Sequence, residues 1–247
     1  MNVSVICAVK NRSKAFERCL YSWKSQTYPF EFIVVDDGST ENIKSVVDQN
    51  FPEAKYVRLE SMRDRTPAVA WNSGYKVSQG DFVIVTNGDL ILSHNAAIQD
   101  ILDSYKGNRV SVLTYFLSKE NTRDLDTINW KENPNLIAEM TNFWSYREYN
   151  QTNINADLLL AGLTTYVAGQ TREDWDFIGL FREEDFQLGA DQDLYLREVI
   201  FEKYADTAKI TRAYHQWHSP PQVNLGASYI YKTERQARLL DPAEREK

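Results

Sequence analysis

Cysteine is scarce in this chain of 247 residues, which contains only Cys7 and Cys19. Two thiols cannot build a disulfide framework or a thiol-rich metal site. Cys7 falls in an apolar run typical of a strand, and Cys19 lies on the apolar side of a predicted helix. We therefore expect both cysteines to be buried free thiols.

Long apolar runs and an excess of positive charge are also missing. No stretch approaches the roughly 18 apolar residues of a membrane span, and the run at residues 3–9 ends in charged residues without a signal-peptide cleavage site. These absences predict a cytoplasmic protein with no membrane span. The formal net charge of −7 argues against general binding of nucleic acids or anionic membranes.

The composition is that of a globular protein, with 43% hydrophobic and 26% charged residues. The first half alternates predicted strands and helices, which predicts an α/β fold with a doubly wound, mostly parallel sheet. The strands are expected at 3–9, 32–35, 55–59, 82–85 and 110–116. One helix is expected to begin near Ser13, a second, short helix to end near residue 49, and two more to lie at 66–77 and 95–105.

The pattern fades between residues 118 and 157, where aromatic residues without a period indicate an ordered loop or short helices. Beyond it we expect an apolar run at 158–167, helices at 173–178, 191–204 and 227–240, and a strand at 213–218. The last helix carries Lys232, Arg235 and Arg238, which form either a solvated face or a contact with a phosphate-bearing acceptor.

The strand at 82–85 ends on Asn87-Gly88-Asp89, where glycine permits a sharp turn between two oxygen-bearing side chains. Ligands bind at the carboxyl ends of the strands in open parallel sheets. Hard oxygen ligands at that edge suit Mg²⁺ or Mn²⁺ holding a phosphate. The alternative is a plain Asn-Gly turn followed by a solvated aspartate.

Asp36 and Asp37 follow the second predicted strand. Adjacent like charges are hard to explain structurally, whereas a carboxylate at this edge can accept a hydrogen bond from a nucleobase or a ribose hydroxyl. Ser39 and Thr40, which follow, can instead cap the next helix.

Taken in order, these segments resemble glycosyltransferase family 2, whose members have the GT-A fold and use nucleotide-activated sugars. The resemblance rests on 3–9 with Asn11-Arg12, Phe32–Thr40, Ala70-Trp71-Asn72-Ser73-Gly74, Asn87-Gly88-Asp89, Ile178-Gly179-Leu180-Phe181 and Ala190-Asp191-Gln192-Asp193-Leu194. It implies one GT-A domain over 1–247, with a nucleotide-sugar-binding half (1–117) and an acceptor-binding half that carries the catalytic base (118–247).

The resemblance also implies roles for single residues. Asp36 or Asp37 would contact the base and ribose, uracil in the commonest case, and Asp89 would carry a divalent cation on the donor diphosphate. Asp191 would be the catalytic base. The implied donor-binding set is Ala8, Asn11, Asp36, Asp37, Arg65, Asn72, Asn87 and Asp89.

Three positions depart from the family pattern. Asn87 stands where the Asp-x-Asp motif has its first acid, which leaves a metal one negative charge fewer. Trp71 replaces an arginine, whose charge Arg65 would supply. Ala190 replaces the glutamate before the base. These changes bear on metal affinity and substrate and not on the fold.

Asp191 heads a predicted helix, whose dipole keeps a carboxylate ionised, as a general base requires. The same preference explains an ordinary acidic residue at a helix start. His215 and His218 lie at a predicted strand end. Related metal-dependent transferases carry a third metal ligand there, and a diphosphate contact or a structural role remain alternatives.

Flat aromatic side chains could stack on sugar rings or pack in the core. The candidates are Trp144, Tyr166, Trp175 and Trp217. Trp175 is the preferred acceptor-side residue, together with Asp193.

The sequence thus predicts an inverting glycosyltransferase that uses Mn²⁺ or Mg²⁺ to move a sugar from a UDP-sugar to an acceptor hydroxyl. A nucleotidyltransferase would need a glycine-rich loop after the first strand, which residues 10–13 lack. A non-catalytic sugar- or partner-binding module is compatible with Asn87 and Ala190. The acceptor stays open and includes carbohydrate, lipid-linked sugar, protein and nucleic acid.

Overall fold

The computed structural model describes residues 1–60, 67–117, 119–130, 166–183, 194, 197–198, 201–203 and 205–216. The strands are β1 (Val3–Val9), β2 (Glu31–Asp36), β3 (Lys55–Arg58), β4 (Phe82–Asn87), β5 (Leu90–Leu92), β6 (Val110–Phe116), β7 (Val167–Thr171) and β8 (Asp206–His215). The helices are α1 (Ser13–Lys24), α2 (Ile43–Asn50), α3 (Pro67–Val77), α4 (Ala97–Ser104), α5 (Lys119–Asp124) and α8 (Arg172–Ile178), with a 3₁₀ turn η1 (Leu125–Thr127).

These strands form one eight-stranded sheet in the order β3-β2-β1-β4-β7-β6-β8-β5. Strand β1 lies between β2 and β4 and is parallel to both, and β2 is parallel to β3. The residues of β1 and nearly all of those of β2 and β4 are buried, as near-continuous apolar strands covered on both faces require. This part of the sheet is as predicted.

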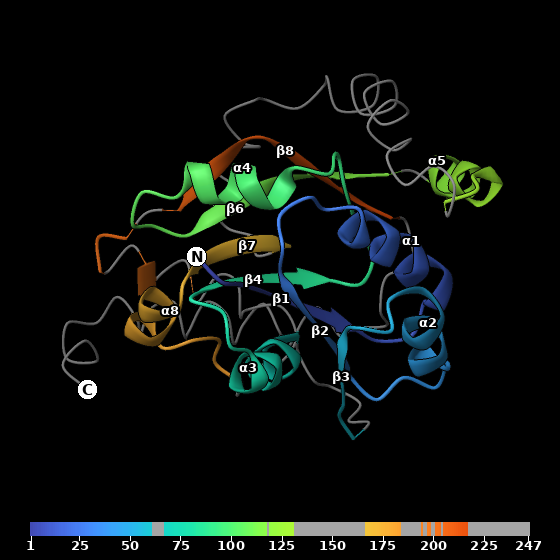
Figure 1. Cartoon of the computed structure of the whole chain (residues 1–247), viewed down its shortest axis with the longest axis horizontal. Coiled ribbons are helices and arrows are strands. Elements are labelled where there is room, and N and C mark those ends of the chain that lie inside the picture. The colour runs from blue at the N-terminus through green and yellow to red at the C-terminus, as the bar shows by residue number, and fades with distance from the viewer. Residues whose placement is uncertain are drawn as a thin grey trace, which may run out of the picture.

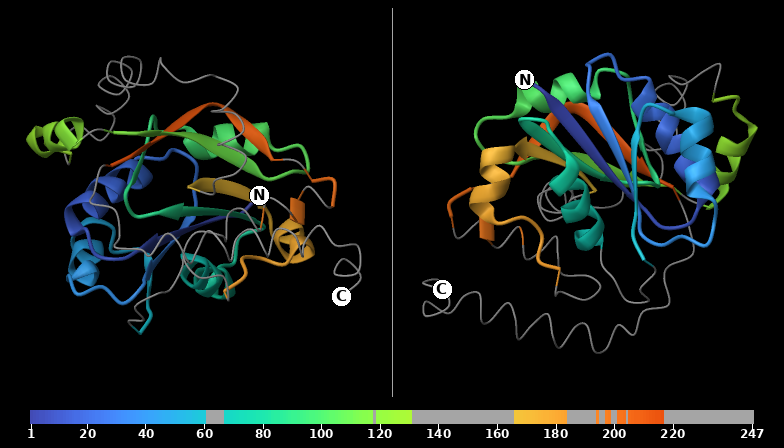
Figure 2. Two further views of the ribbon diagram at one scale, coloured as in Figure 1. Left: turned by 180° about the vertical axis from the view of Figure 1, so that it is seen from behind. Right: turned by 60° about the horizontal axis from the view of Figure 1, so that its bottom comes forward.

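The other half of the sheet is mixed, although four of the seven pairings between the described strands are parallel, as a mostly parallel sheet requires. Strand β7 is inserted between β4 and β6 and is antiparallel to both. Strand β8 is parallel to β6 but antiparallel to the short edge strand β5. The alternation of strands and helices could not reveal that residues 167–171 return into the middle of the sheet. The two views of Figure 2 show its twist.

Helices cover both faces of the sheet (Figure 1). Alternate residues of β1 divide between two cores, with Val5 and Cys7 in the core shared with α1, α2 and α4, and Ile6 and Ala8 in the core shared with α3 and α8. Cys7 and Cys19 are both buried free thiols, as predicted. The faces alternate because side chains on a strand point to opposite sides.

Helix α1 buries its apolar positions as predicted, but its first turn is built differently. Arg12, directly before the predicted start at Ser13, occupies the N-cap position in the left-handed region at φ 62, and its side chain makes no capping hydrogen bond. The carboxylate of Glu41 accepts from the backbone N–H groups of Arg12 and Ser13, each at 2.8 Å. The cap therefore comes from the loop after β2.

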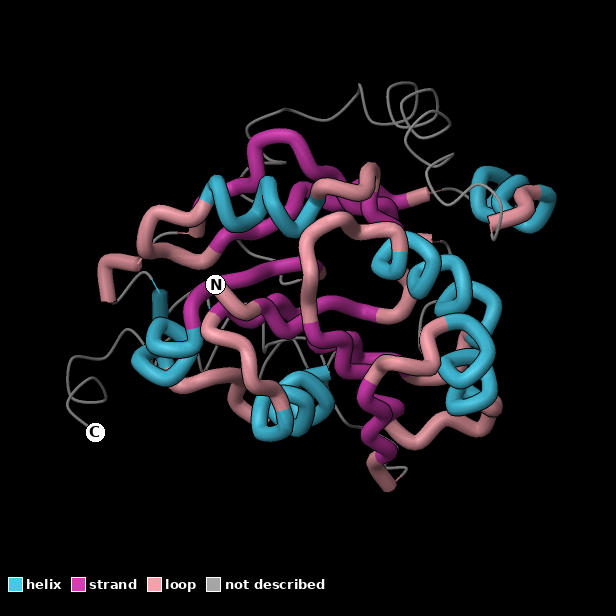
Figure 3. The backbone as a smooth tube through the Cα atoms, viewed as in Figure 1, coloured by secondary structure: helices cyan, strands magenta, loops and turns pink. Residues whose placement is uncertain are grey.

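Strands from both halves of the chain join the same sheet, and Figure 3 shows the strands in magenta with helices on either side. The last strand begins at Asp206, seven residues before its predicted start at 213, because Lys209 and Arg212 interrupt its apolar pattern. None of the helices among the described residues is long and apolar enough to cross a membrane. The division into a donor half and an acceptor half stays a prediction.

Candidate active site

The carboxyl ends of β1, β2 and β4 meet at one edge of the sheet. Ala8 pairs with Asn87 in the β1–β4 register. The Gly88 N–H donates to the Ala8 carbonyl, and the Asp37 N–H to the Val9 carbonyl, each at 2.8 Å. The backbone therefore brings three of the predicted donor-binding segments side by side.

Asp89, the predicted metal ligand, lies in the turn between β4 and β5 and is 7% exposed. Its Oδ2 accepts from the guanidinium of Arg12 at 2.8 Å. Nε2 of His215, at the end of β8, lies 3.6 Å from the same oxygen. Residues far apart in the sequence thus converge on one carboxylate.

Asp89 and His215 fit a divalent cation as neighbouring ligands. Two ligand bonds of about 2.1 Å can bridge two atoms 3.6 Å apart. The described residues contain no group of three or more His, Cys, Asp and Glu side chains that could hold a metal. A cation held by two protein groups would take its remaining ligands from water and donor phosphates, which is how Mg²⁺ is usually bound.

Asp36 and Asp37 separate in the fold. Asp36 is fully buried, and its Oδ2 accepts from the Tyr56 hydroxyl and the Arg58 guanidinium, each at 2.6 Å. Its Oδ1 accepts from the Ser39 N–H at 2.8 Å. Since protein groups engage both oxygens, Asp36 fixes the sheet edge. Asp37 lies at the rim, with Oδ2 3.5 Å from Nζ of Lys10.

Asn11 shapes the loop that carries Arg12. Both residues adopt left-handed backbone, with φ of 58 and 62, a conformation that asparagine tolerates better than most residues. Oδ1 of Asn11 accepts from the N–H groups of Thr40 at 2.8 Å and Glu41 at 3.3 Å. Asn11 was predicted to bind the donor, and in the structure its amide oxygen holds the β2–α2 loop. Sequence reasoning missed the roles of Arg12 and Glu41.

Asn72 was also predicted to bind the donor, but it is buried and holds a loop. Its Nδ2 donates to the Phe181 carbonyl at 2.7 Å, and Arg197 donates to the Leu180 carbonyl at 2.6 Å. Leu180 has φ 52, in the left-handed region that is unfavourable for a residue other than glycine. The two side chains therefore secure a strained turn after α8.

Trp175 does not lie where an acceptor could stack on it. The side chain is 1% exposed, and its Nε1 donates to the Val83 carbonyl at 3.0 Å. Thr171 caps α8 by accepting from the Asp174 N–H, and Trp175 of this helix reaches β4 through its bond to Val83. The Trp175 ring is part of the core because its helix is held against the sheet in this way. Arg65, Asp191, Asp193, His218, Trp144 and Trp217 lie outside the described residues.

Residues 4–172 match the family profile described as Glycosyl transferase family 2. The chain belongs to this family. The chain is 30% identical over 95 residues to the glycosyltransferase GlyG of Streptococcus pneumoniae, covering 38% of this chain and 32% of the relative. It is 34% identical over 95 residues to chondroitin synthase of Pasteurella multocida, covering 36% of this chain and 10% of the relative. The matches thus span a third or less of these relatives.

Solved structures show that this family 2 glycosyltransferase has the GT-A fold. TarS of S. aureus, residues 1–349 in complex with UDP-GlcNAc, superposes with a TM-score of 0.68 at 16% identity, covering 97% of this chain and 66% of that one. The mannosyltransferase PcManGT from Pyrobaculum calidifontis, in complex with GDP-Man and Mn²⁺, superposes with a TM-score of 0.60 at 19% identity, covering 96% of this chain and 61% of that one.

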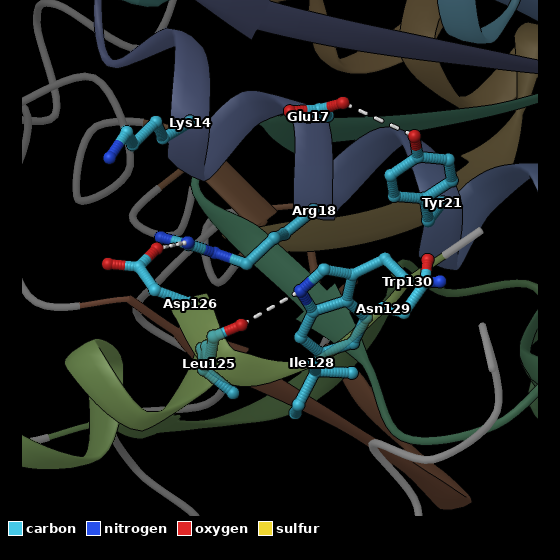
Figure 4. Close-up of a pocket in the computed structure, with 9 residues that line it drawn as sticks. All are labelled: Lys14, Glu17, Arg18, Tyr21, Leu125, Asp126, Ile128, Asn129 and Trp130. Atoms are coloured by element: carbon cyan, nitrogen blue, oxygen red, sulfur yellow. Dashed lines mark hydrogen bonds and ion pairs between the residues drawn. The ribbon is translucent and has the colours of Figure 1, made fainter. Parts of the chain in front are cut away.

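The glycosyltransferase also has a pocket of about 310 Å³ between α1 and residues 125–130 (Figure 4). Its wall includes Arg18, whose NH1 donates to Asp126 at 2.5 Å and whose Nε donates to Gln216 at 2.5 Å. Gln216 in turn donates its backbone N–H to the Asp89 carbonyl at 3.0 Å. Arg18 thus connects this pocket to the turn that carries Asp89.

Proposed function

We propose that this chain transfers a sugar from a nucleoside-diphosphate sugar, most simply a UDP-sugar, to an acceptor hydroxyl with inversion at the anomeric carbon. The observation that carries the proposal is the meeting of Asp89, His215 and Arg12 at the rim that also holds Asp37. Two structural neighbours are complexes with UDP-GlcNAc and with GDP-Man, which supports a nucleotide-sugar donor.

Asp37, Asp89 and His215 each have a chemical task in this proposal. Asp37 accepts hydrogen bonds from the base or ribose of the donor. Asp89 and His215 hold Mn²⁺ or Mg²⁺, which supplies Lewis-acid stabilisation of charge on the departing diphosphate. The Mn²⁺ in the PcManGT complex supports a divalent cation.

The sequence resemblance makes Asp191 the general base. Its carboxylate takes the proton of the acceptor hydroxyl as the hydroxyl oxygen attacks the anomeric carbon, and the bond to the diphosphate oxygen breaks on the opposite side. One base and no covalent intermediate suffice for inversion. The acceptor can be a carbohydrate or another hydroxyl-bearing molecule.

The test is a screen of UDP-GlcNAc, UDP-glucose and GDP-mannose with Mn²⁺, Mg²⁺ or EDTA. We expect slow, metal-dependent release of the nucleoside diphosphate from at least one donor even without acceptor, and a rise in melting temperature with the matching nucleotide and metal. The Asp89→Asn variant should lack the metal-dependent release. Release of pyrophosphate with transfer of a nucleoside monophosphate would instead identify a nucleotidyltransferase.

A further inference from the structure

The loop between β1 and α1 places one cation on each of two rim carboxylates. Nζ of Lys10 lies 3.5 Å from Oδ2 of Asp37, and NH1 of Arg12 lies 2.8 Å from Oδ2 of Asp89. The two carboxylates are nearly buried, whereas the side chains of Lys10 and Arg12 are 37% and 39% exposed. Each of these two rim carboxylates therefore has a positive side chain of the same loop beside it.

The backbone at Asn11 and Arg12 is strained, and contacts with the loop after β2 hold Arg12 in place. Two successive non-glycine residues in the left-handed region are unfavourable and persist only where other contacts hold them. Here Glu41 accepts from the Arg12 N–H, and the Asn11 side chain accepts from the loop that carries Glu41. The turn directs Arg12 across the rim, to a residue 77 positions further along the chain.

Arg12 and a divalent cation would share one ligand atom. Oδ2 of Asp89 accepts from Arg12 and is the oxygen that faces His215. A divalent ion on this oxygen would stand beside a guanidinium, and like charges at such a distance repel. The exposed, flexible side chain of Arg12 can turn away, and a diphosphate offers it two oxygens in the fork geometry that a guanidinium prefers.

We propose that Arg12 is a diphosphate ligand that occupies the metal-binding carboxylate of Asp89 until the donor arrives. Arg12 leaves Asp89 when the diphosphate accepts its hydrogen bonds, and the vacated oxygen becomes available to the cation. Binding of cation and of diphosphate is then positively coupled, since each favours the same position of Arg12. This inference rests on the proposed function and adds a residue that neither the sequence motifs nor the comparisons assign.

The test measures Mn²⁺ binding to the folded, full chain by electron paramagnetic resonance, first without any nucleotide. Arg12→Gln should bind Mn²⁺ about tenfold more tightly than wild type, because the competing cation is gone. Lys14→Gln is the matched control, since it removes one positive charge from an exposed residue two positions further on. Its Mn²⁺ affinity should stay within about twofold of wild type.

The second arm repeats the titration with inorganic pyrophosphate and with UDP. Wild type should bind Mn²⁺ at least about fivefold more tightly with either ligand present, and Arg12→Gln should lose most of this gain. Unchanged, weaker or undetectable Mn²⁺ binding by Arg12→Gln without nucleotide overturns the proposal. Coupling with pyrophosphate but none with UDP, and no donor turnover, would retain the role of Arg12 and reject the proposed UDP-sugar chemistry.

Discussion

Nε2 of His215 lies 3.6 Å from Oδ2 of Asp89, so the last described strand ends against the turn that follows β4. The sheet achieves this contact by pairing His215 with Leu90, one residue after Asp89. A carboxylate and an imidazole at that distance could supply two neighbouring ligands to a divalent cation. In the proposed function, water and the donor phosphates would supply the remaining ligands, so metal and donor binding would be interdependent.

Replacing Asp89 with asparagine should abolish metal-dependent donor hydrolysis while leaving the fold intact. The amide side chain of this variant retains an oxygen that can accept from Arg12 but loses the charge that a cation needs. We expect a fall in rate of about 100-fold or more, measured as nucleoside diphosphate released with saturating Mn²⁺.

The control for this variant is Asp48→Asn, an exposed carboxylate whose described ion pair is with Lys44. It should keep wild-type activity. If Asp89→Asn retains more than about half of the wild-type rate, Asp89 is not the metal ligand.

The cap that Glu41 provides for α1 should make stability depend on pH. Hydrogen bonds from the hydroxyl and N–H of Ser13 and from the N–H of Arg12 hold the pKa of Glu41 below its ordinary value of 4.5. Because the folded-state pKa is lowered, the stabilisation is fully present above about pH 4.5 and is lost as pH falls through the folded-state pKa.

Urea unfolding of wild type and Glu41→Gln at several pH values tests this cap. Solvent screening keeps the expected loss at neutral pH to about 0.5–1 kcal/mol, and the difference between the two proteins should shrink below pH 4.5. Glu53→Gln, an exposed position near the end of α2, should match wild type throughout. A difference that does not change with pH would contradict a role for the carboxylate charge.

Arg18→Met should destabilise the protein by about 1–3 kcal/mol, because it leaves the buried Gln216 side chain without its donor. Arg18 is 7% exposed and Gln216 is fully buried. Nε2 of Gln216 also donates to the Ala15 carbonyl at 2.9 Å, so the loss weakens the link between α1 and the end of β8.

The measurement is the free energy of unfolding in urea, with Lys14→Met as the control from an exposed position on the same helix. Lys14→Met should change stability by less than about 0.5 kcal/mol. Equal stabilities of Arg18→Met and wild type would mean that the Arg18–Gln216 contact contributes nothing to the fold.

Asp191→Asn should stop sugar transfer while preserving nucleotide binding. An asparagine cannot accept the proton of the acceptor hydroxyl, but it keeps the size of the aspartate and leaves the donor rim untouched. Calorimetry with UDP and Mn²⁺ should give a Kd within about twofold of wild type, alongside a rate at least about 1,000-fold lower. Wild-type turnover by this variant would show that another group is the base.

Much of the parallel half of the sheet could be predicted because its signals are local. Apolar runs with turns after them predict buried strands, and the apolar stripe of α1 buries Phe16, Cys19, Leu20 and Trp23 as its period requires. The order of strands and helices then brings the ends of β1, β2 and β4 to one edge. Asp37 and Asp89 reach that edge through their positions directly after the strands.

The roles of single side chains were decided by contacts between distant segments. Asp36 and Asp37 are adjacent in the sequence, yet Tyr56 and Arg58 donate to the Asp36 carboxylate whereas Lys10 lies beside Asp37, because successive residues at a strand end point in different directions. Asn72 was predicted to bind the donor and Trp175 the acceptor, but both side chains are buried in the protein interior by tertiary packing.

The sequence by itself determined the apolar periodicity, the turns and the chain order, and hence which residues follow which strands. Only the tertiary structure decided that β7 enters between β4 and β6 and that Arg12 meets Asp89. The physical reason is the distance along the chain over which each kind of interaction acts. Periodicity arises from neighbours a few residues apart, whereas a hydrogen-bond partner is selected by the direction of a side chain in the completed fold.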